Sequence, residues 1–484
     1  MSLSSALSIA QSALLATSRQ TSVVSRNVSD ASNSDYTRRI AVVSSTTPGA
    51  RVVDIQRVTN DLLFRQNLGA LSAYSGQNAL YSGMDQLDVA VNGVDNASSP
   101  STAIANLQQQ LQLYATSPSN QNLGSTVIDA ARQVVRSLNE GSQAIQAFRT
   151  QTDGQIDTAV KDLNSLLSQF QDANQAVISG TRSGTDVSDA LDQRDALLKK
   201  IADYVPVSTF TRGDNDMVIT TGDGTTLFET IPRTVSFTPS AGYAAGAAGN
   251  TVYIDNVPVS AGASGNTSAS GKLAGLLLLR DDVASTMQSQ LDETARGLIT
   301  AFAETAPSMP NAAGLFTWSG APAVPAAGTL VNGLAGSISI NAAMDPSAGG
   351  NPTLLRDGGA NGAAYVANTS GGASYSSLLV AYGDRLDQPM TFDSAAGISA
   401  TSSVSDYAAN SIGWLQGMRQ QASTASNAKE ALAQRSAEAL SNATGVNVDQ
   451  EMSLMLDLEH TYQASARMMK TVDDMMTALL NAVG

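Results

Sequence analysis

The sequence has no cysteine and little charge or aromatic character. Its 484 residues therefore form no disulfide, no thiolate nucleophile and no zinc–thiolate site. Charged residues make up 14% and aromatic residues 5% of the chain, whereas hydrophobic residues make up 42%, enough for the cores of about two to four domains. Small uncharged polar side chains lose water at little cost. This composition suits a protein surrounded by other protein, and it also fits a low-charge bacterial protein without special partners.

Positive charge is scarce as well. The chain has 27 Lys and Arg against 42 Asp and Glu, a net charge of −15, and its strongest basic spot is the pair Arg38-Arg39. Nucleic-acid binding needs a basic footprint, so we expect no nucleic-acid partner. Purely apolar runs are short, as at Leu276–Leu279, so we expect no membrane insertion. Met1–Ser5 has no basic residue before its apolar ones, which argues against a Sec-type signal peptide.

Both ends of the chain carry apolar residues at alternating steps of three and four, the spacing of a coiled-coil seam. The first seam contains small and β-branched residues, which favour close packing. The second is rich in methionine, with six of the 14 methionines between Met452 and Met476. Methionine fits an adaptable interface and ordinary core filling equally well. The expected assembly seam consists of Leu3, Leu7, Leu14, Val24, Val28, Met455, Leu458, Tyr462, Met469, Val472, Met476 and Leu479.

The middle of the chain alternates between helical and β-type patterns. Helices are predicted over 60–93, 102–117, 123–180, 186–203, about 272–305 and 402–442. The helix over 123–180 would span roughly 85 Å, longer than the helices of a compact domain. Short β-type runs are predicted at Ile40–Val43, Arg51–Ile55, Val207–Thr211, Met217–Thr221, Thr226–Ile231, Thr234–Phe237, Thr251–Ile254 and near Ser337–Ile340. The stretch 307–400, rich in Gly, Ala, Ser and Pro, is predicted to elaborate the surface of a helical stem.

These patterns predict a mainly α fold with inserted β structure. Long terminal coiled-coil helices would join an elongated helical-bundle stem, and a small β-rich outer domain would be inserted in the middle. The expected terminal assembly domain is 1–59 with 443–484. The stem is 60–205, 272–306 and 401–442, and the outer domain is 206–271 with 307–400.

No constellation of residues points to catalysis. His460 is the only histidine, and a lone helical histidine without cysteine makes no typical transition-metal site. No GxSxG elbow, P-loop or strand-linked GxGxxG is present. Asp214–Asp216 and Asp223-Gly224 resemble pieces of a calcium loop, but they lack the EF-hand spacing and fit hairpin turns better. We therefore expect no enzyme activity, no cofactor and no metal site.

The end sequences resemble the flagellar hook-associated protein 1 family. Gly445–Met452 and Tyr462–Arg467 are similar to that family's Gly-Val-Asn-Leu-Asp-Glu-Glu-Met and Tyr-Gln-Ala-Ser-Ala-Arg. Asn27–Ala31 and Tyr36–Arg39 are similar to its Asn-Ile-Ala-Asn-Ala and Gly-Tyr-Ser-Arg-Gln. Before the tyrosine, this chain has Asn33–Asp35 where the family has Thr-Pro-Gly. These motifs cover about the first 40 and last 40 residues.

The resemblance implies a structural subunit in the layer between the flagellar hook and filament. Its implied partners are further copies of itself, the hook protein and a second hook-associated junction protein. The resemblance also implies export in an unfolded state by the flagellar type III apparatus, a dedicated export chaperone on the C-terminal helix, and an extracellular location.

Three alternatives stay open at this point. The chain could be another axial protein, such as the distal junction protein or a flagellin-like protein. It could be a secreted adhesin or enzyme carried on an axial-protein frame, with its activity in 206–400. A soluble coiled-coil scaffold unrelated to flagella also fits the periodicity.

Overall fold

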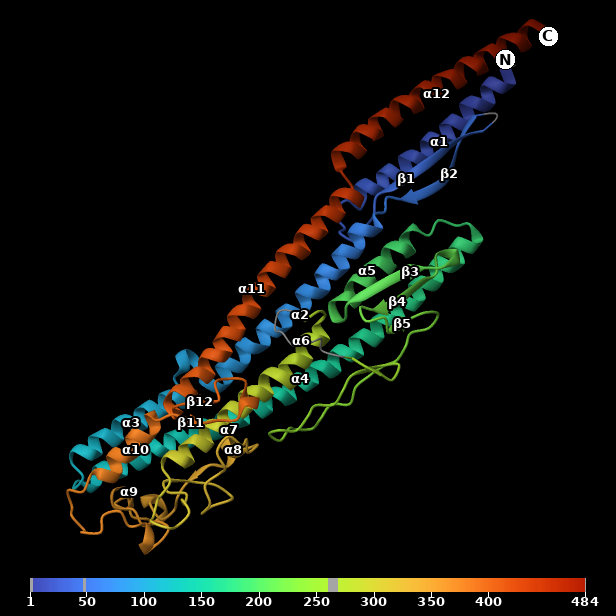
Figure 1. The fold of residues 1–484 in the computed structure, drawn as a ribbon. Coiled ribbons are helices and arrows are strands. Elements are labelled where there is room, and N and C mark those ends of the chain that lie inside the picture. The colour runs from blue at the N-terminus through green and yellow to red at the C-terminus, as the bar shows by residue number, and fades with distance from the viewer. Residues whose placement is uncertain (1–2, 47–48, 260–268, 484) are drawn as a thin grey trace.

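The computed structural model describes residues 3–46, 49–259 and 269–483. The chain forms an elongated rod with both ends at the same tip (Figure 1). From this tip the first helix runs down the rod, and the last helix returns beside it. The mainly α fold with inserted β structure is confirmed.

The tip is a small unit, here called the terminal domain, made of residues 3–57 and 448–483. It contains helix α1 (Leu3–Ser29), the antiparallel hairpin β1 (Arg39–Thr46) and β2 (Gly49–Arg57), and helix α12 (Val448–Val483). Both predicted strand runs lie in this hairpin, while Pro48, expected in its turn, lies outside the described residues. Helix α12 begins seven residues before the seam at Met455. Its start is capped by Asn447, whose side chain accepts a hydrogen bond from the Gln450 amide at 3.2 Å.

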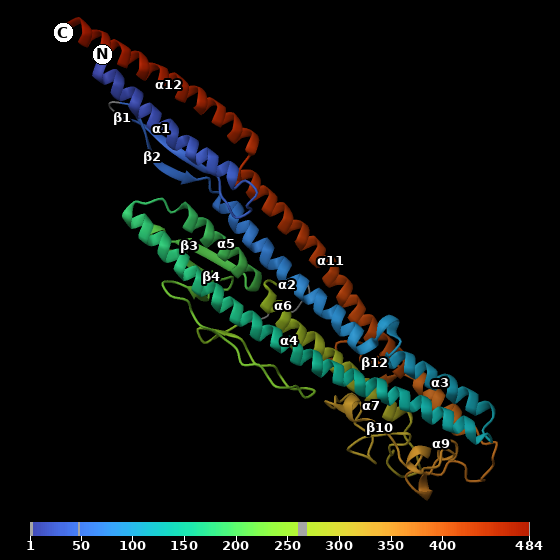
Figure 2. The ribbon, with the colours of Figure 1, turned by 180° about the vertical axis from the view of Figure 1, so that it is seen from behind.

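The stem consists of long helices that run along the rod (Figure 2). They are α2 (Asp61–Asn92), α3 (Pro100–Thr116), α4 (Gln121–Ser183), α5 (Ser188–Tyr204), α6 (Lys272–Leu278), a π-helical turn (Leu279–Val283), α7 (Ala284–Ala301) and α11 (Val404–Thr444). The predicted helices are confirmed to within a few residues. Side chains of Asn60, Ser99 and Ser403 cap three of these helices at their N-termini.

Two small antiparallel sheets lie along α4. One contains β3 (Val207–Thr211), β4 (Met217–Thr221) and β5 (Thr226–Phe228); the other contains β6 (Val235–Ser236), β7 (Tyr253–Ile254) and β8 (Val257–Pro258). The Phe228 ring packs edge to face on the ring of Phe170 in α4, with the two ring centres 5.0 Å apart. The Asn164 side chain of α4 bonds both the backbone N–H and the carbonyl of Val235. These strands therefore share the core of the stem instead of enclosing one of their own, as the predicted β domain would.

The far end of the rod, residues 302–403, is irregular. Its elements are β9 (Phe316–Thr317), α8 (Leu334–Ser337), β10 (Ser339–Ile340), α9 (Leu354–Asp357), α10 (Ser377–Asp387), β11 (Met390–Thr391) and β12 (Thr401–Ser402). Single 3-10 turns lie at Val94–Asn96, Gly213–Asn215, Pro346–Ala348, Ala363–Tyr365 and Ser394–Ala396. The strand expected near Ser337–Ile340 is confined to its last two residues, and α10 was not predicted.

Buried carboxylates organise this irregular end, and one of them, Asp292, belongs to α7. The Asp292 carboxylate accepts hydrogen bonds from the amides of Gly333 and Ala335, both at 2.8 Å. The carboxylate of buried Glu304 accepts from the amides of Ala360 and Asn361, both at 2.9 Å. Burial raises the pKa of Asp292 to about 6 even though three hydrogen bonds favour its charged form. In this irregular end, buried carboxylates accept hydrogen bonds from backbone amides that neighbouring strands would pair in a regular sheet.

The apolar core belongs to the stem. Among the described residues, the main cluster of buried hydrophobic side chains runs from Leu68 to Ala422 and contains no member of the terminal domain. The terminal domain buries a separate small set, which includes Ala10, Val24, Val52 and Leu458. The two parts are therefore not joined by a common apolar core.

Candidate assembly site

Helices α1 and α12 lie side by side and run in opposite directions (Figures 1 and 2). On α12 the buried positions are Glu451, Leu458 and Ser465, seven residues apart and between 1% and 6% exposed. On α1 they include Ala10, Thr17 and Val24, with the same spacing. A seven-residue repeat of buried positions is the geometry of a coiled-coil contact.

The predicted seam residues differ in how far they are covered. Val24 and Leu458 are buried. A second group is half-buried and consists of Leu3, Leu7, Leu14, Val28, Met455, Met469 and Val472. A third is exposed and consists of Tyr462, Met476 and Leu479. Exposed Tyr462 lies between the buried positions Leu458 and Ser465, so part of the apolar surface of α12 is uncovered even beside α1.

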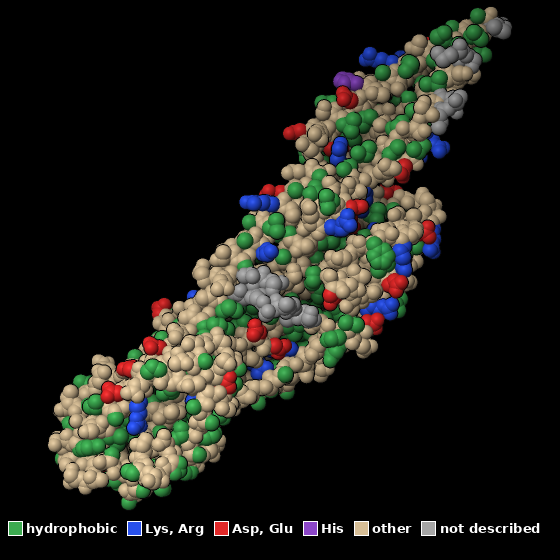
Figure 3. Space-filling model, viewed as in Figure 1, with side chains coloured by type: hydrophobic (Ala, Val, Ile, Leu, Met, Phe, Trp, Pro, Cys, Tyr) green, Lys and Arg blue, Asp and Glu red, His purple; other side chains and the backbone are tan. Residues whose placement is uncertain are grey.

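Further apolar side chains of α12 project beside this seam. They are Val448, Met452, Leu454, Leu456, Met468, Met475 and Leu480, all exposed by 39% or more. Hydrophobic side chains are also visible over the terminal domain in the space-filling view, where His460 marks the surface of α12 (Figure 3). Large exposed apolar side chains concentrated on one helix mark a contact surface. The sequence contains the signal for them, namely apolar residues that fall between the seam positions.

A buried polar cluster, here called the latch, ties the start of α12 to the end of α1. The carboxylate of Glu451, 1% exposed, accepts from the Arg38 guanidinium at 2.6 Å and from the Asn27 amide at 2.9 Å. Asn27 also donates to the Arg39 carbonyl, and its oxygen accepts from the Tyr36 hydroxyl. Burial raises the pKa of Tyr36 to about 12, so this hydroxyl remains a donor.

The latch lies where the chain passes between terminal domain and stem. The chain crosses twice, at residues 58–60 between β2 and α2 and at residues 445–447 between α11 and α12. The backbone of Arg38 bridges the two crossings. Its N–H donates to the Thr444 carbonyl and its carbonyl accepts from the Val58 N–H, both at 2.9 Å.

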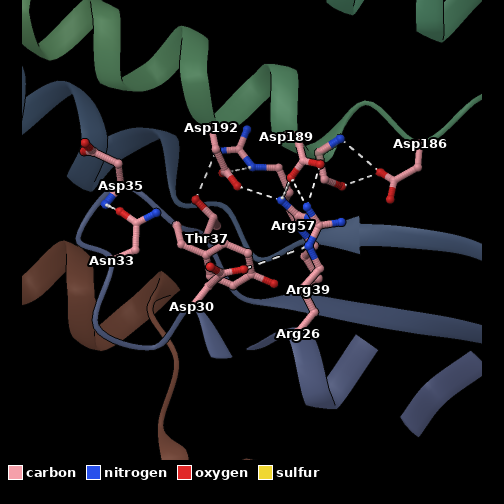
Figure 4. A network of polar contacts seen from close by, with 12 residues as sticks. Arg26, Asp30, Asn33, Asp35, Thr37, Arg39, Arg57, Asp186, Asp189 and Asp192 are labelled. Atoms are coloured by element: carbon pink, nitrogen blue, oxygen red, sulfur yellow. Dashed lines mark hydrogen bonds and ion pairs between the residues drawn. The ribbon is translucent and has the colours of Figure 1, made fainter. Parts of the chain in front are cut away.

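A second network, here called the clamp, joins the terminal domain to α5 of the stem (Figure 4). Its cations are Arg26 of α1, Arg39 of β1 and Arg57 of β2, and its anions are Asp189, Asp192 and Asp195 of α5. Arg39 pairs with Asp189 at 2.5 Å and Asp192 at 2.9 Å, and Arg57 pairs with Asp192 at 2.9 Å and Asp195 at 2.6 Å. Arg26 reaches Asp189 at 2.6 Å. Steps of three residues put all three carboxylates on one face of α5.

The clamp carboxylates have unequal surroundings. Burial disfavours the charged form of Asp189, but hydrogen bonds from Arg26 and Arg39 outweigh it and lower its pKa. Burial dominates at Asp192 and raises its pKa despite the nearby Arg57 and Arg39. This network was not predicted from the sequence, because its partners lie about 150 residues apart. The Arg38-Arg39 pair, too short for a nucleic-acid footprint, binds carboxylates of the same chain.

Comparison with known proteins agrees with this architecture. Residues 84–307 match the model of the flagellar hook-associated protein FlgK helical domain, and residues 439–482 match that of the flagellar basal body rod FlgEFG protein C-terminal segment. Flagellar hook-associated protein 1 of Bacillus subtilis is 22% identical across 99% of this chain and 98% of its own length. The chain belongs to the flagellar hook-associated protein 1 family. The recognition made from the end motifs is confirmed.

Other members of the family match over less of their length. The Escherichia coli protein is 25% identical and the Salmonella typhimurium protein 23%, each over 62% of this chain and 56% of the relative. The solved structure of the flagellar hook junction protein FlgK from Burkholderia pseudomallei shares the fold. Its TM-score is 0.57 at 14% identity, over 78% of this chain and 99% of that one.

Family membership makes the chain a structural component of the flagellum. Among the helices that the structure describes, none is long and apolar enough to cross a lipid bilayer. Within the same residues, no group of three His, Cys, Asp or Glu side chains is placed to hold a metal ion.

Proposed function

We propose that this chain forms the layer between the flagellar hook and the filament, and that its terminal helices are the assembly element. The observation that carries the proposal is the α1–α12 pair, which buries one stripe at seven-residue spacing, with Leu458 as its apolar residue on α12, and leaves a second, apolar stripe on α12 exposed. The buried stripe serves the subunit itself. The exposed one is available to further copies of the chain in the same layer.

The partners above and below this layer are part of the same proposal. The hook protein would lie on one side and a second hook-associated junction protein on the other. The role is structural and not enzymatic, with no cofactor. We also propose that the chain divides functionally at its two crossings. Because α11 continues to Thr444, the change from stem to terminal domain then falls at 445–447 and not at residue 443.

Deletion of the gene tests this placement directly. We expect cells with complete hooks, no filaments, and filament protein released into the medium, because filament subunits would have no layer on which to assemble. Electron microscopy of the hooks and immunoblots of the medium would measure both. Cells that still carry filaments of normal length would contradict the proposal.

Before assembly, we propose that the same α12 surface binds an export chaperone and that export proceeds through the flagellar type III apparatus in an unfolded state. A helix with exposed methionine and leucine side chains suits a partner with an apolar groove. Affinity for such a chaperone should fall at least tenfold when residues 466–483 are removed, as titration calorimetry would show.

Amide exchange on the purified chain tests the state of the free ends. We expect residues 466–482 to exchange at least a hundredfold faster than residues 156–170 of α4, because most side chains of the former are exposed, whereas the latter include the buried Ile156, Leu163 and Phe170. Residues of α1 should fall between the two. Equal protection of α12 and α4 would exclude a loosely held C-terminal helix.

A further inference from the structure

The contact between the terminal domain and the stem is polar. The main apolar cluster stops short of the terminal domain, and the two crossings at 58–60 and 445–447 are only three residues each. No packed core therefore fixes the angle between the two parts. That angle depends on the side chains that bridge the two parts beside the crossings.

The clamp is the main part of this bridge, and a more exposed ion pair between Lys199 of α5 and Asp35, at 3.0 Å, lies beside it. Arg39 and Arg57 have side chains that are 2% and 8% exposed, so each needs its carboxylate partners on α5 to offset the loss of water. Arg39 also lies over the Tyr36 ring, with its guanidinium carbon 4.8 Å from the ring centre. Thr37 accepts a hydrogen bond from Arg57 at 3.0 Å. The three arginines come from α1, β1 and β2, so the clamp holds the N-terminal part of the terminal domain.

Beside the clamp the two parts do not pack. A groove of about 1140 Å³ lies between them, lined by residues 30–37 and 57–61, by the start of α2, by α5 and β3, and by the end of α11. Because this space holds no packed side chains, the terminal domain can turn about the crossings without displacing a core. Breakage of the clamp is the main event that such a motion requires.

We propose that the clamp is a releasable lock on a hinge between the terminal domain and the stem. With the clamp closed, the free subunit holds one angle; with the clamp open, the terminal domain samples a range of angles while both parts stay folded. The geometry alone supports this inference, and it does not depend on where in the flagellum the subunit lies.

The absence of cysteine makes the test direct. Two introduced cysteines, Ser18→Cys on α1 and Ser168→Cys on α4, would carry spin labels at unique positions, both exposed. Pulsed electron resonance would then measure the distribution of distances between them. The test variant is Asp189→Asn with Asp192→Asn and Asp195→Asn. The matched control is Asp129→Asn with Asp157→Asn and Asp214→Asn, which removes the same charge from ion pairs with Arg132, Lys161 and Arg182.

We expect one narrow distance peak for the parent and for the control variant. For the clamp variant the peak should widen at least twofold, while circular dichroism stays within a few per cent of the parent. A distribution as narrow as the parent's in the folded clamp variant would overturn the proposal. If the triple variant does not fold, the pair Asp189→Asn with Asp195→Asn decides by the same readout, because it leaves the most buried carboxylate in place.

Discussion

Cells that produce the Glu451→Lys variant are expected to swim no better than a deletion strain. The substitution puts an ammonium beside Arg38 at a position that is 1% exposed, where the native carboxylate accepts from Arg38 and Asn27. Breaking such a buried pair costs about 3–5 kcal/mol, and the added like charge raises that cost. The start of α12 would separate from α1, and the assembly element would be lost. Soft-agar motility and counts of filaments per cell measure the outcome.

Glu459→Lys provides the matched control for this experiment. It makes the same charge change in the same helix, but Glu459 is exposed, and its carboxylate accepts a hydrogen bond from the Gln463 side chain. Surface changes of this kind stay within about 0.5 kcal/mol. We expect near-normal swimming. Equal loss of motility in both variants would show that net charge, and not the latch, controls assembly.

The second large effect is expected at two leucines that are neighbours on α12 but face different surroundings. Leu458 is 6% exposed in the contact with α1, whereas Leu456 is 56% exposed. Leu458→Asp should destabilise the α1–α12 pair by about 3 kcal/mol, because it buries a charge and leaves a gap. Amides of α1 would exchange faster in the purified chain, and cells would lack filaments.

Leu456→Asp should affect assembly alone. In the free chain its carboxylate faces water, so α1 amides should exchange at the parent rate. In a layer of subunits the same carboxylate would face the apolar surface of a neighbour, and filament counts should fall severalfold. Swimming cells with Leu456→Asp would show that the exposed α12 surface is not used. If the amides of α1 exchanged at the parent rate in Leu458→Asp, Leu458 would not be needed for the packing of α1 on α12.

The long helices were predictable because their apolar residues recur at helical spacing and polar residues cap their ends. Asn60 and Ser403 show how a single side chain fixes a start. The early start of α12 was missed because its first turn, Val448–Glu451, lacks the apolar spacing. Glu451 occupies the buried position of this turn because its carboxylate accepts a hydrogen bond from the Asn27 side chain.

The β-branched residues predicted where the strands lie, but they did not predict what the strands pack against. Strand pattern does not tell whether a short sheet encloses its own core or rests on a helix, and here Phe228 packs on Phe170 of α4. The helix α10 escaped notice because its eleven residues lie between Gly- and Ser-rich segments. Hydrogen bonds to buried Asp292 and Glu304 organise the rest of that end, and such long-range bonds leave no local pattern.

The assembly site was predictable in part. The periodicity placed the seam residues on two helices that the structure brings together, and it identified neither their unequal exposure nor the polar contacts around them. The clamp joins Arg39 to Asp192, and the latch joins Asn27 to Glu451, 424 positions later in the chain. Polar contacts of this kind depend on the folded geometry, so the spacing of residues within one helix does not identify the partner on another element.

The two crossings joined through Arg38 have a mechanical consequence. A part connected by a single strand swivels freely, whereas one connected by two adjacent strands bends about one axis and resists torsion. The Arg38 backbone bonds Thr444, which adjoins one crossing, and Val58, which lies on the other, so the crossings cannot slide past each other without breaking at least one of these bonds. We expect a subunit built in this way to accommodate a change of curvature between its neighbours and still to transmit torque along its length.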